Sequence, residues 1–185
     1  MEVRYQWEAI AKQWRSQPSS GYTLLEWVVV ILIVGILAAI QVPSWSGLLH
    51  RSRLSIAHNQ VYQAMQEAQG NARRQKVTWQ VSFRLLGDKT QWAIHPKANT
   101  PGTAQWHTLD SRIELDDKET TLRKAQNVYR VEFNHRGHIN GQLGRVTLAV
   151  KNTKTLKRCV IVSTLLGHLR RGEYHSKARD GRHCY

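Results

Sequence analysis

The most uniform stretch of the chain is an apolar run from Tyr22 to Val42, in which Glu26 is the only charged residue. A helix of this length extends about 31 Å, which matches the hydrocarbon core of about 30 Å of a bilayer. A buried helix of a soluble core is the alternative, but few such helices are apolar on every face over this length. The pattern therefore predicts a membrane-spanning helix over 22–42.

A second pattern begins after Pro43, which predicts a bend without an end to the helix. Apolar residues now recur every three or four positions, with polar residues between them. This spacing predicts that the helix continues as an amphipathic segment over 43–75 and ends near Arg73 and Arg74. The apolar stripe consists of Leu54, Ala57, Val61, Ala64, Ala68 and Ala72.

From residue 76 onward the apolar period shortens toward two residues, which is typical of strands. Segments 77–85 and 91–94 flank a Gly87-Asp88 turn and predict a hairpin. A loop is predicted over 99–102. The expected fold class is α+β: a long N-terminal helix, half membrane-spanning and half amphipathic, packed on an antiparallel β-sheet domain over 76–185. Further strands are predicted over 112–115, 128–133, 145–150, 158–163 and 167–171.

Glu26 is unusual because a carboxylate near a bilayer costs roughly a few kcal/mol unless it has a partner. A chance acid at the membrane interface is the alternative. The neighbouring residues supply a specific explanation, because together they resemble the type IV prepilin signature. Counted from Tyr22, which follows Gly21, the acid Glu26 is residue five, Gly35 is fourteen and Pro43 is twenty-two, and the family favours all of these positions.

The resemblance implies that a prepilin peptidase removes a leader over 1–21 by cutting after Gly21 and then N-methylates Tyr22. The family usually has Phe or Met in place of Tyr22, and a smaller residue in place of Trp27, but both residues keep the helix apolar. The leader is polar and lacks the apolar centre of a secretory signal peptide, which fits a leader that stays cytoplasmic until it is cut.

Cleavage would expose an ammonium group at Tyr22. In a bundle of such helices this group can pair with the Glu26 carboxylate of a neighbouring subunit, because an unpaired charge in low dielectric is costly. Gly35 and Pro43 are assembly residues by resemblance. The implied partners are the prepilin peptidase/N-methylase, other pilins or pseudopilins in a filament, and the inner membrane.

Within the C-terminal domain, the segment Phe133-Asn-His-Arg-Gly137 and the following predicted strands are similar to a narrower group. This group comprises the H-type minor pseudopilins of type II secretion and the FimT-like minor pilins. The resemblance implies a minor structural subunit, assembled at the tip of a pseudopilus or pilus. It also implies a single pass through the bacterial inner membrane, with the globular domain in the periplasm.

Two cysteines lie near the C-terminus, Cys159 and Cys184. In an oxidising compartment they would close a loop worth about 3 kcal/mol in the chain-entropy model. Two unrelated thiols are the alternative. Three histidines nearby lack the tight pair spacing of a metal site, so we expect no metal and no cofactor, and we interpret them as polar residues of a flexible tail. They are His168, His175 and His183.

The formal net charge is +14, and the segment from Lys151 to Tyr185 carries nine basic residues against two acidic ones. Such density suits a polyanion, with DNA foremost, and the FimT-like branch includes DNA-binding minor pilins. Tyr174 and His175 are candidates to stack on bases. The alternative is that the positive charge serves solubility, or attraction to anionic lipids and polysaccharide, rather than DNA binding. The candidate DNA contacts are Arg170, Arg171, Lys177, Arg179 and Arg182.

The chain contains no nucleophile elbow, P-loop, zinc motif or paired-carboxylate spacing, so no catalytic residue is assigned and no enzyme is expected. Asp116, Asp117 and Glu119 are interpreted as a solvated turn. Two hypotheses remain: a structural filament subunit and a pilus-borne DNA receptor. Retardation of DNA by the protein in a mobility assay at low salt would distinguish them. The sequence does not decide whether such a subunit belongs to a secretion pseudopilus, a type IV pilus or a competence apparatus.

Overall fold

A computed structural model describes residues 21–99, 101–153 and 155–185, without the side chains of 40–44 and 101. Of the predicted leader, only Gly21 lies within the described residues. The chain divides into two compact units, Met1–Trp45 and Ser46–Tyr185. Each unit is described by itself.

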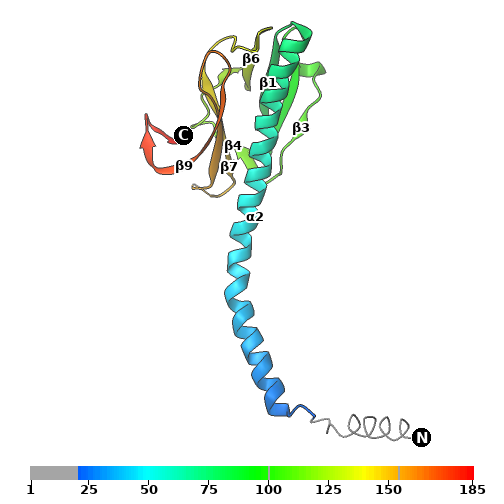
Figure 1. Ribbon diagram of the computed structural model, residues 1–185, viewed down its shortest axis with the longest axis vertical. Helices are drawn as coiled ribbons and strands as arrows, with labels where there is room; N and C mark the ends of the chain where they lie inside the picture. Colours follow the sequence, from blue (N-terminus) through cyan, green and yellow to red (C-terminus); the bar gives the residue numbers. More distant parts are fainter. Residues whose placement is uncertain (1–20, 100, 154) are drawn as a thin grey trace, which may run out of the picture. The chain divides into compact units, whose positions relative to one another are not determined.

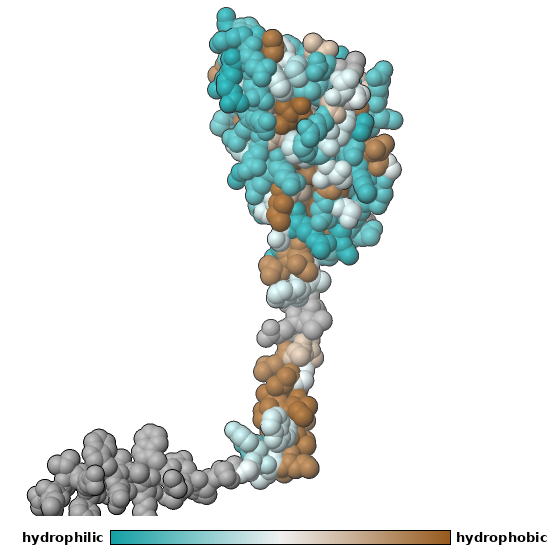
Figure 2. All heavy atoms as spheres, turned by 90° about the vertical axis from the view of Figure 1, so that its right-hand side faces the viewer, coloured by the Kyte–Doolittle hydropathy of each residue, from teal (hydrophilic) through white to brown (hydrophobic). Residues whose placement is uncertain are grey.

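Helix α2, Leu24–Gln75, begins in the first unit and ends in the second. The prediction of one long helix is confirmed, with its start at Leu24 rather than Tyr22, and Pro43 does not end it. All side chains over 24–39 are exposed, and this part of the helix forms the brown, apolar surface in Figure 2. The second unit presents a mostly hydrophilic surface in the same view.

The apolar stripe predicted along the second half of α2 is buried against the strands. Its six residues are at most 2% exposed, and Met65 joins them. Four of the six are alanines, whose small side chains let a helix approach a sheet closely. The core that they share contains Phe83, Phe133, Val146 and Val160 from the strands. The amphipathic interpretation of this segment is confirmed.

Two five-stranded antiparallel sheets pack with this part of α2, where a single sheet was expected (Figure 1). The first has the order β3-β2-β1-β6-β5 and the second β10-β9-β8-β7-β4. The predicted hairpin is confirmed as β1 and β2, joined at Gly87 with φ of +58°. The strands are β1 Trp79–Leu86, β2 Lys89–Pro96, β3 His107–Thr108, β4 Ile113–Leu115, β5 Arg123–Ala125, β6 Val128–Phe133, β7 Gly144–Val150, β8 Lys157–Val162, β9 Leu169–Arg179 and β10 Arg182–Cys184.

Three strands were not predicted: β3, β5 and β10, each of only two or three residues. The strand predicted over 167–171 continues as β9 to Arg179. The expectation of a flexible C-terminal tail was therefore wrong, because β9 and β10 pair with each other in this region. In place of the loop predicted over 99–102, a short 3-10 helix begins at Pro101 and ends at Thr103.

Two glycine turns meet the side chain of Gln69 on α2. Its Nε2 donates hydrogen bonds to the carbonyl oxygens of Gly137 (2.7 Å) and Gly167 (3.0 Å). Gly167 has a φ of +83°, and a Cβ there would collide with the Gly137 carbonyl oxygen and with Gln69. Only glycine therefore fits this position, where both turns are joined to the helix.

We expect Gly167→Ala to lower the free energy of unfolding by about 2–3 kcal/mol, because it adds steric overlap to an unfavourable φ. Gly181→Ala is the matched control, since Gly181 also has a positive φ (+70°) but no atom within 4 Å of an added Cβ. Urea unfolding of both variants measures the difference. An equal loss of stability in the two variants would show that the contact with Gln69 and Gly137 is unimportant.

Cys159 in β8 and Cys184 in β10 form a disulfide, with Cα atoms 6.1 Å apart. Next to it, the buried His58 of α2 donates a hydrogen bond from Nε2 to the Cys159 carbonyl oxygen at 3.0 Å. Burial lowers the pKa of His58, although this hydrogen bond opposes the shift. At neutral pH, His58 is therefore neutral in the fold.

A second buried histidine, His95, behaves similarly. Its Nδ1 donates to the Pro96 carbonyl oxygen, which leaves Nε2 to accept from Ser82 Oγ at 3.1 Å and from Gln80. Burial lowers the pKa of His95 as well, although the Pro96 hydrogen bond opposes the shift. Every ring nitrogen of this neutral tautomer has a partner, so the role of His95 is structural.

Both lowered pKa values predict a loss of stability in mild acid. Above pH 6.5, the ordinary histidine pKa, both histidines are neutral in either state, so their stabilising contribution is fully present. It is lost as the pH falls from 6.5 toward the folded-state pKa values, because only the unfolded chain takes up the protons readily. The melting temperature should fall between pH 7 and 5, and His58→Gln with His95→Gln should flatten this slope. His135→Gln, at an exposed site, should leave the slope unchanged, and a slope unaffected by the double change would contradict the account.

Candidate processing and assembly site

The predicted cleavage point lies directly before the first turn of α2. Gly21, Tyr22 and Thr23 have no regular structure and are exposed. Thr23 caps the helix, because the Glu26 N–H donates to the Thr23 carbonyl oxygen (3.1 Å) and to its hydroxyl (3.3 Å). This cap explains why the helix begins two residues later than predicted and leaves the Gly21–Tyr22 bond outside the helix.

Glu26 lies in the first turn of the helix, where the partial positive charge of the N-terminus favours a carboxylate. The sequence Thr-x-x-Glu from Thr23 to Glu26 is that of a capping box. The Glu26 side chain is exposed, and it forms no salt bridge with another described residue. The carboxylate is thus exposed beside the helix end, where a neighbouring positive charge can reach it.

Tyr22 and Trp27, the two departures from the usual signature, contact each other edge to face, with ring centroids 6.0 Å apart. The structure therefore brings together Gly21, Tyr22 and Glu26 around one helix end. Gly35 lies farther along α2, with no atom within 4 Å of an added Cβ. Pro43 is within the helix, but its side chain lies outside the described part.

Over the described residues, no helix meets the length and hydropathy expected of a membrane span.

The basic residues predicted to contact DNA lie on the C-terminal hairpin, four on β9 and Arg182 on β10. Arg170 and Arg171 are consecutive in a strand, so they point to opposite faces. The Arg171 guanidinium lies over the Tyr62 ring of α2, 4.3 Å from its centroid. The five residues are thus not gathered on one face, and DNA contact by Arg170, Arg171, Lys177, Arg179 and Arg182 stays a prediction.

The two aromatic rings considered for base stacking already stack within the chain. Tyr174 stacks on His183, with centroids 5.5 Å apart, and His175 stacks on Tyr185 at 4.1 Å. Within the described ranges, no cluster of three or more His, Cys, Asp or Glu side chains is arranged to hold a metal ion. The two stacked ring pairs, Tyr174 with His183 and His175 with Tyr185, instead stiffen the hairpin of β9 and β10.

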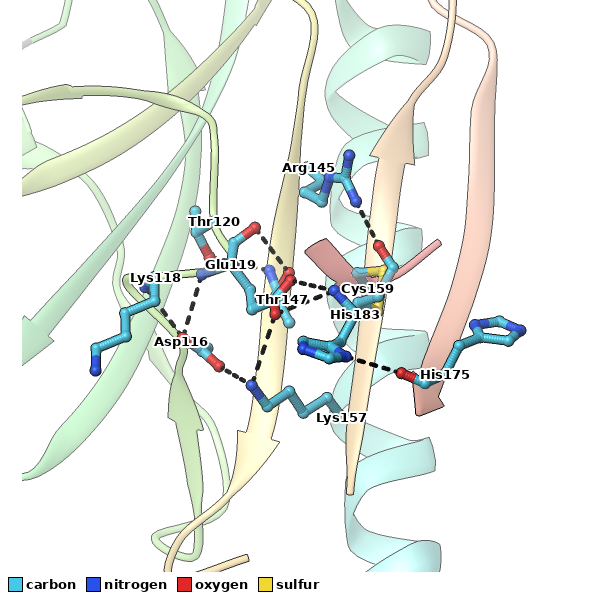
Figure 3. Close-up of polar contacts among 11 residues, drawn as sticks. Asp116, Lys118, Glu119, Thr120, Arg145, Thr147, Lys157, Cys159, His175 and His183 are labelled. Atoms are coloured by element: carbon cyan, nitrogen blue, oxygen red, sulfur yellow. Dashed lines mark hydrogen bonds and ion pairs between the residues drawn. A yellow bond between two sulfur atoms is a disulfide. The ribbon is translucent and has the colours of Figure 1, made fainter. Parts of the chain in front are cut away.

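A polar cluster holds the C-terminal strand in place (Figure 3). Glu119 is only 5% exposed, and both of its carboxylate oxygens accept from the His183 N–H, at 3.2 and 3.1 Å. Lys157 forms an ion pair with Asp116 at 2.7 Å. Arg145 donates from Nη1 to the Cys184 carbonyl oxygen at 2.5 Å.

The interpretation of the 116–119 segment as a solvated turn was wrong for Glu119, which is buried. Asp117 is more open and pairs with Lys124 at 3.1 Å. Sequence reasoning missed this burial because no local pattern marks Glu119. The next residue, Thr120, is also buried, and its hydroxyl accepts from the Thr147 N–H. The cluster links this turn to β7 and β10, and its role is structural.

A capped N-terminal helix that carries this processing motif, packed on antiparallel sheets, defines a pilin-like subunit. Residues 17–40 match the prokaryotic N-terminal methylation motif. Residues 57–166 match the family described as Type II transport protein GspH, so the chain belongs to the GspH family.

The chain is also similar to individual proteins and solved structures. Fimbrial protein EcpC of Eikenella corrodens is 46% identical over 43 residues, which span 23% of this chain and 28% of EcpC. Two crystal structures of the type IV minor pilin FimU of Pseudomonas aeruginosa share the fold, each with a TM-score of 0.50. One, at 15% identity, aligns 69% of this chain with 98% of FimU, and the other, at 13%, aligns 65% with 88%. The predicted α+β pilin-like fold is confirmed.

Proposed function

We propose that this protein is a non-enzymatic minor subunit of a type II secretion pseudopilus or a type IV pilus. A prepilin peptidase cleaves it after Gly21 and methylates the new amine of Tyr22. The processed subunit then joins a filament, at or near its tip, through the Tyr22 ammonium and the Glu26 carboxylate of adjacent protomers.

The observation that carries this proposal is the geometry of the helix start. The Thr23 cap leaves the Gly21–Tyr22 bond exposed and outside the helix, where a peptidase can reach it. The same cap places Glu26 in the first turn, facing outward. Cleavage would put a positive charge within a few residues of this carboxylate, in register with the methylation motif at 17–40.

Anchoring in the inner membrane is part of the same proposal. The described side chains from Leu24 to Leu37 are large, apolar and exposed, apart from Glu26 and Gly35, and water is a poor environment for such a surface. A bilayer, or the apolar helix bundle of a filament, would cover it. The Cys159–Cys184 disulfide fits a globular domain in an oxidising compartment such as the periplasm.

Filament incorporation tests the proposal. An epitope-tagged chain, produced in its own cells, should appear in the membrane fraction and in sheared filaments, or cross-linked to other pilin-like subunits. It should be lost from filaments, but not from the membrane, in cells without prepilin peptidase. Deleting the gene and measuring secreted enzymes and surface pili side by side would identify the machine. Equal filament incorporation with and without the peptidase would contradict the proposal.

A further inference from the structure

Two exposed leucines lie in the turn between β8 and β9. Leu165 and Leu166 are 63% and 66% exposed. Leu166 lines a groove of about 610 Å³ between this turn and α2. The groove is lined by Tyr62, Gln66, Gln69, Arg73, Thr164, Leu166, Gly167, His168 and Leu169.

One wall of the groove is a single stripe of α2. Its residues, at positions 62, 66, 69 and 73, follow the spacing of one helix face, which spans about 16 Å. The opposite wall is fixed to this stripe, because the Gln69 amide binds the carbonyl oxygens of Gly137 and Gly167. The groove is thus formed in advance, and a partner that enters it would not need to order the turn.

Two arginines lie at or next to the groove. Arg73 lies in its wall, and Arg171 lies over the ring of Tyr62 beside it. No carboxylate is among the residues that line it. Glu67, the nearest acid along the helix, does not lie on the stripe at 62, 66, 69 and 73. The lining combines the apolar side chains of Leu166 and Leu169 with the cation of Arg73, which suits a partner that offers apolar and acidic side chains together.

We propose that this groove docks an acidic, leucine-rich extended segment of a different protein subunit. A second copy of this chain is the wrong partner on electrostatic grounds, since each copy carries a net charge of +14. Complementary charge would instead speed the encounter with an acidic subunit and exclude self-association. This inference rests on the proposed filament function and names the chemistry of the neighbour.

A peptide of alternating acid and leucine is the probe. The length of the groove corresponds to about five extended residues, so we choose fluorescein-labelled Glu-Leu-Glu-Leu-Glu-Leu. Its anisotropy is measured with the full chain in nonionic detergent micelles, with empty micelles subtracted. We expect saturable binding at 50 mM NaCl that weakens at 300 mM, because exposed charges are screened by salt.

Two variants locate the binding. Leu166→Ser and Arg73→Gln should each weaken peptide binding at least fivefold. Leu86→Ser and Arg123→Gln are the matched controls, because these residues are also exposed but lie on β1 and β5, and they should bind as the unaltered chain does. Circular dichroism confirms that the variants are folded.

Three results would overturn the inference. The first is a lack of saturable binding of the Glu-Leu peptide. The second is equal affinity for Lys-Leu-Lys-Leu-Lys-Leu or Glu-Ser-Glu-Ser-Glu-Ser, and the third is an equal loss of peptide affinity in the control variants. Self-association of the chain that Leu166→Ser abolishes would replace the acidic subunit with a second copy. The assay needs neither cleavage nor a filament, so its failure would leave the proposed function standing, and loss of that function would not alter the binding result.

Discussion

Glu26→Val is expected to abolish filament incorporation while leaving the subunit in the membrane. The change removes the carboxylate that we pair with the Tyr22 ammonium of the adjacent protomer. A buried charge that loses its partner costs about 3–5 kcal/mol. Since 1.4 kcal/mol is a factor of ten, the amount of subunit in filaments should fall at least 100-fold.

The helix itself should survive this change. Thr23 still supplies the cap, and Glu26 adds to it only through the helix dipole, which is worth about 0.3–1 kcal/mol. Quantitative immunoblots of membrane and sheared-filament fractions measure the two pools. Glu67→Val is the matched control, as an exposed acid on the same helix but in the globular unit, and it should assemble normally. Normal assembly of Glu26→Val would show that the Glu26 carboxylate does not need to pair with the Tyr22 ammonium of an adjacent protomer.

Loss of the disulfide should produce the second large effect. Replacing both Cys159 and Cys184 with serine should lower the free energy of unfolding by about 3 kcal/mol, given the sequence separation of 25 residues. The bridge joins β10 to β8 although β10 has only three residues. Without it, that strand depends on its pairing with β9 and on Glu119 and Arg145, whose hydrogen bonds end on backbone atoms of His183 and Cys184.

Urea unfolding with and without a reducing agent measures this contribution. Reduction of the unaltered chain should lower its free energy of unfolding by as much as the double substitution does. The reducing agent should not change the free energy of unfolding of the substituted chain. Equal stability of the oxidised, reduced and substituted forms would show that the C-terminal strand does not need the disulfide.

Sequence patterns predicted the parts of this fold that depend on local periodicity. The stripe from Leu54 to Ala72 was predicted because a helix face repeats regularly, and the hairpin because Gly87 sits between two alternating segments. The first turn of α2 was predicted as a functional site because the motif is contiguous in sequence. Its Thr23 cap went unnoticed, although Thr-x-x-Glu is visible in the sequence.

The unpredicted parts depend on contacts between distant residues. Strand β10 is polar and short, and nothing in Arg182-His-Cys184 alternates. It forms because of a disulfide to residue 159 and a hydrogen bond from His183 to Glu119, 64 positions away. Glu119 looks solvated in its acidic segment and is buried only because β7 and β10 cover it. Local patterns likewise cannot tell one sheet from two, since the strand order is set by long-range pairing such as β1 with β6.

The central claim is that processing creates the amine that Glu26 binds. Intact-mass and N-terminal peptide mass spectrometry of the chain purified from membranes and filaments tests it most directly. The account predicts a chain that begins at Tyr22 and carries one added methyl group on its amine. A filament-associated chain that still contains residues 1–21 would contradict it.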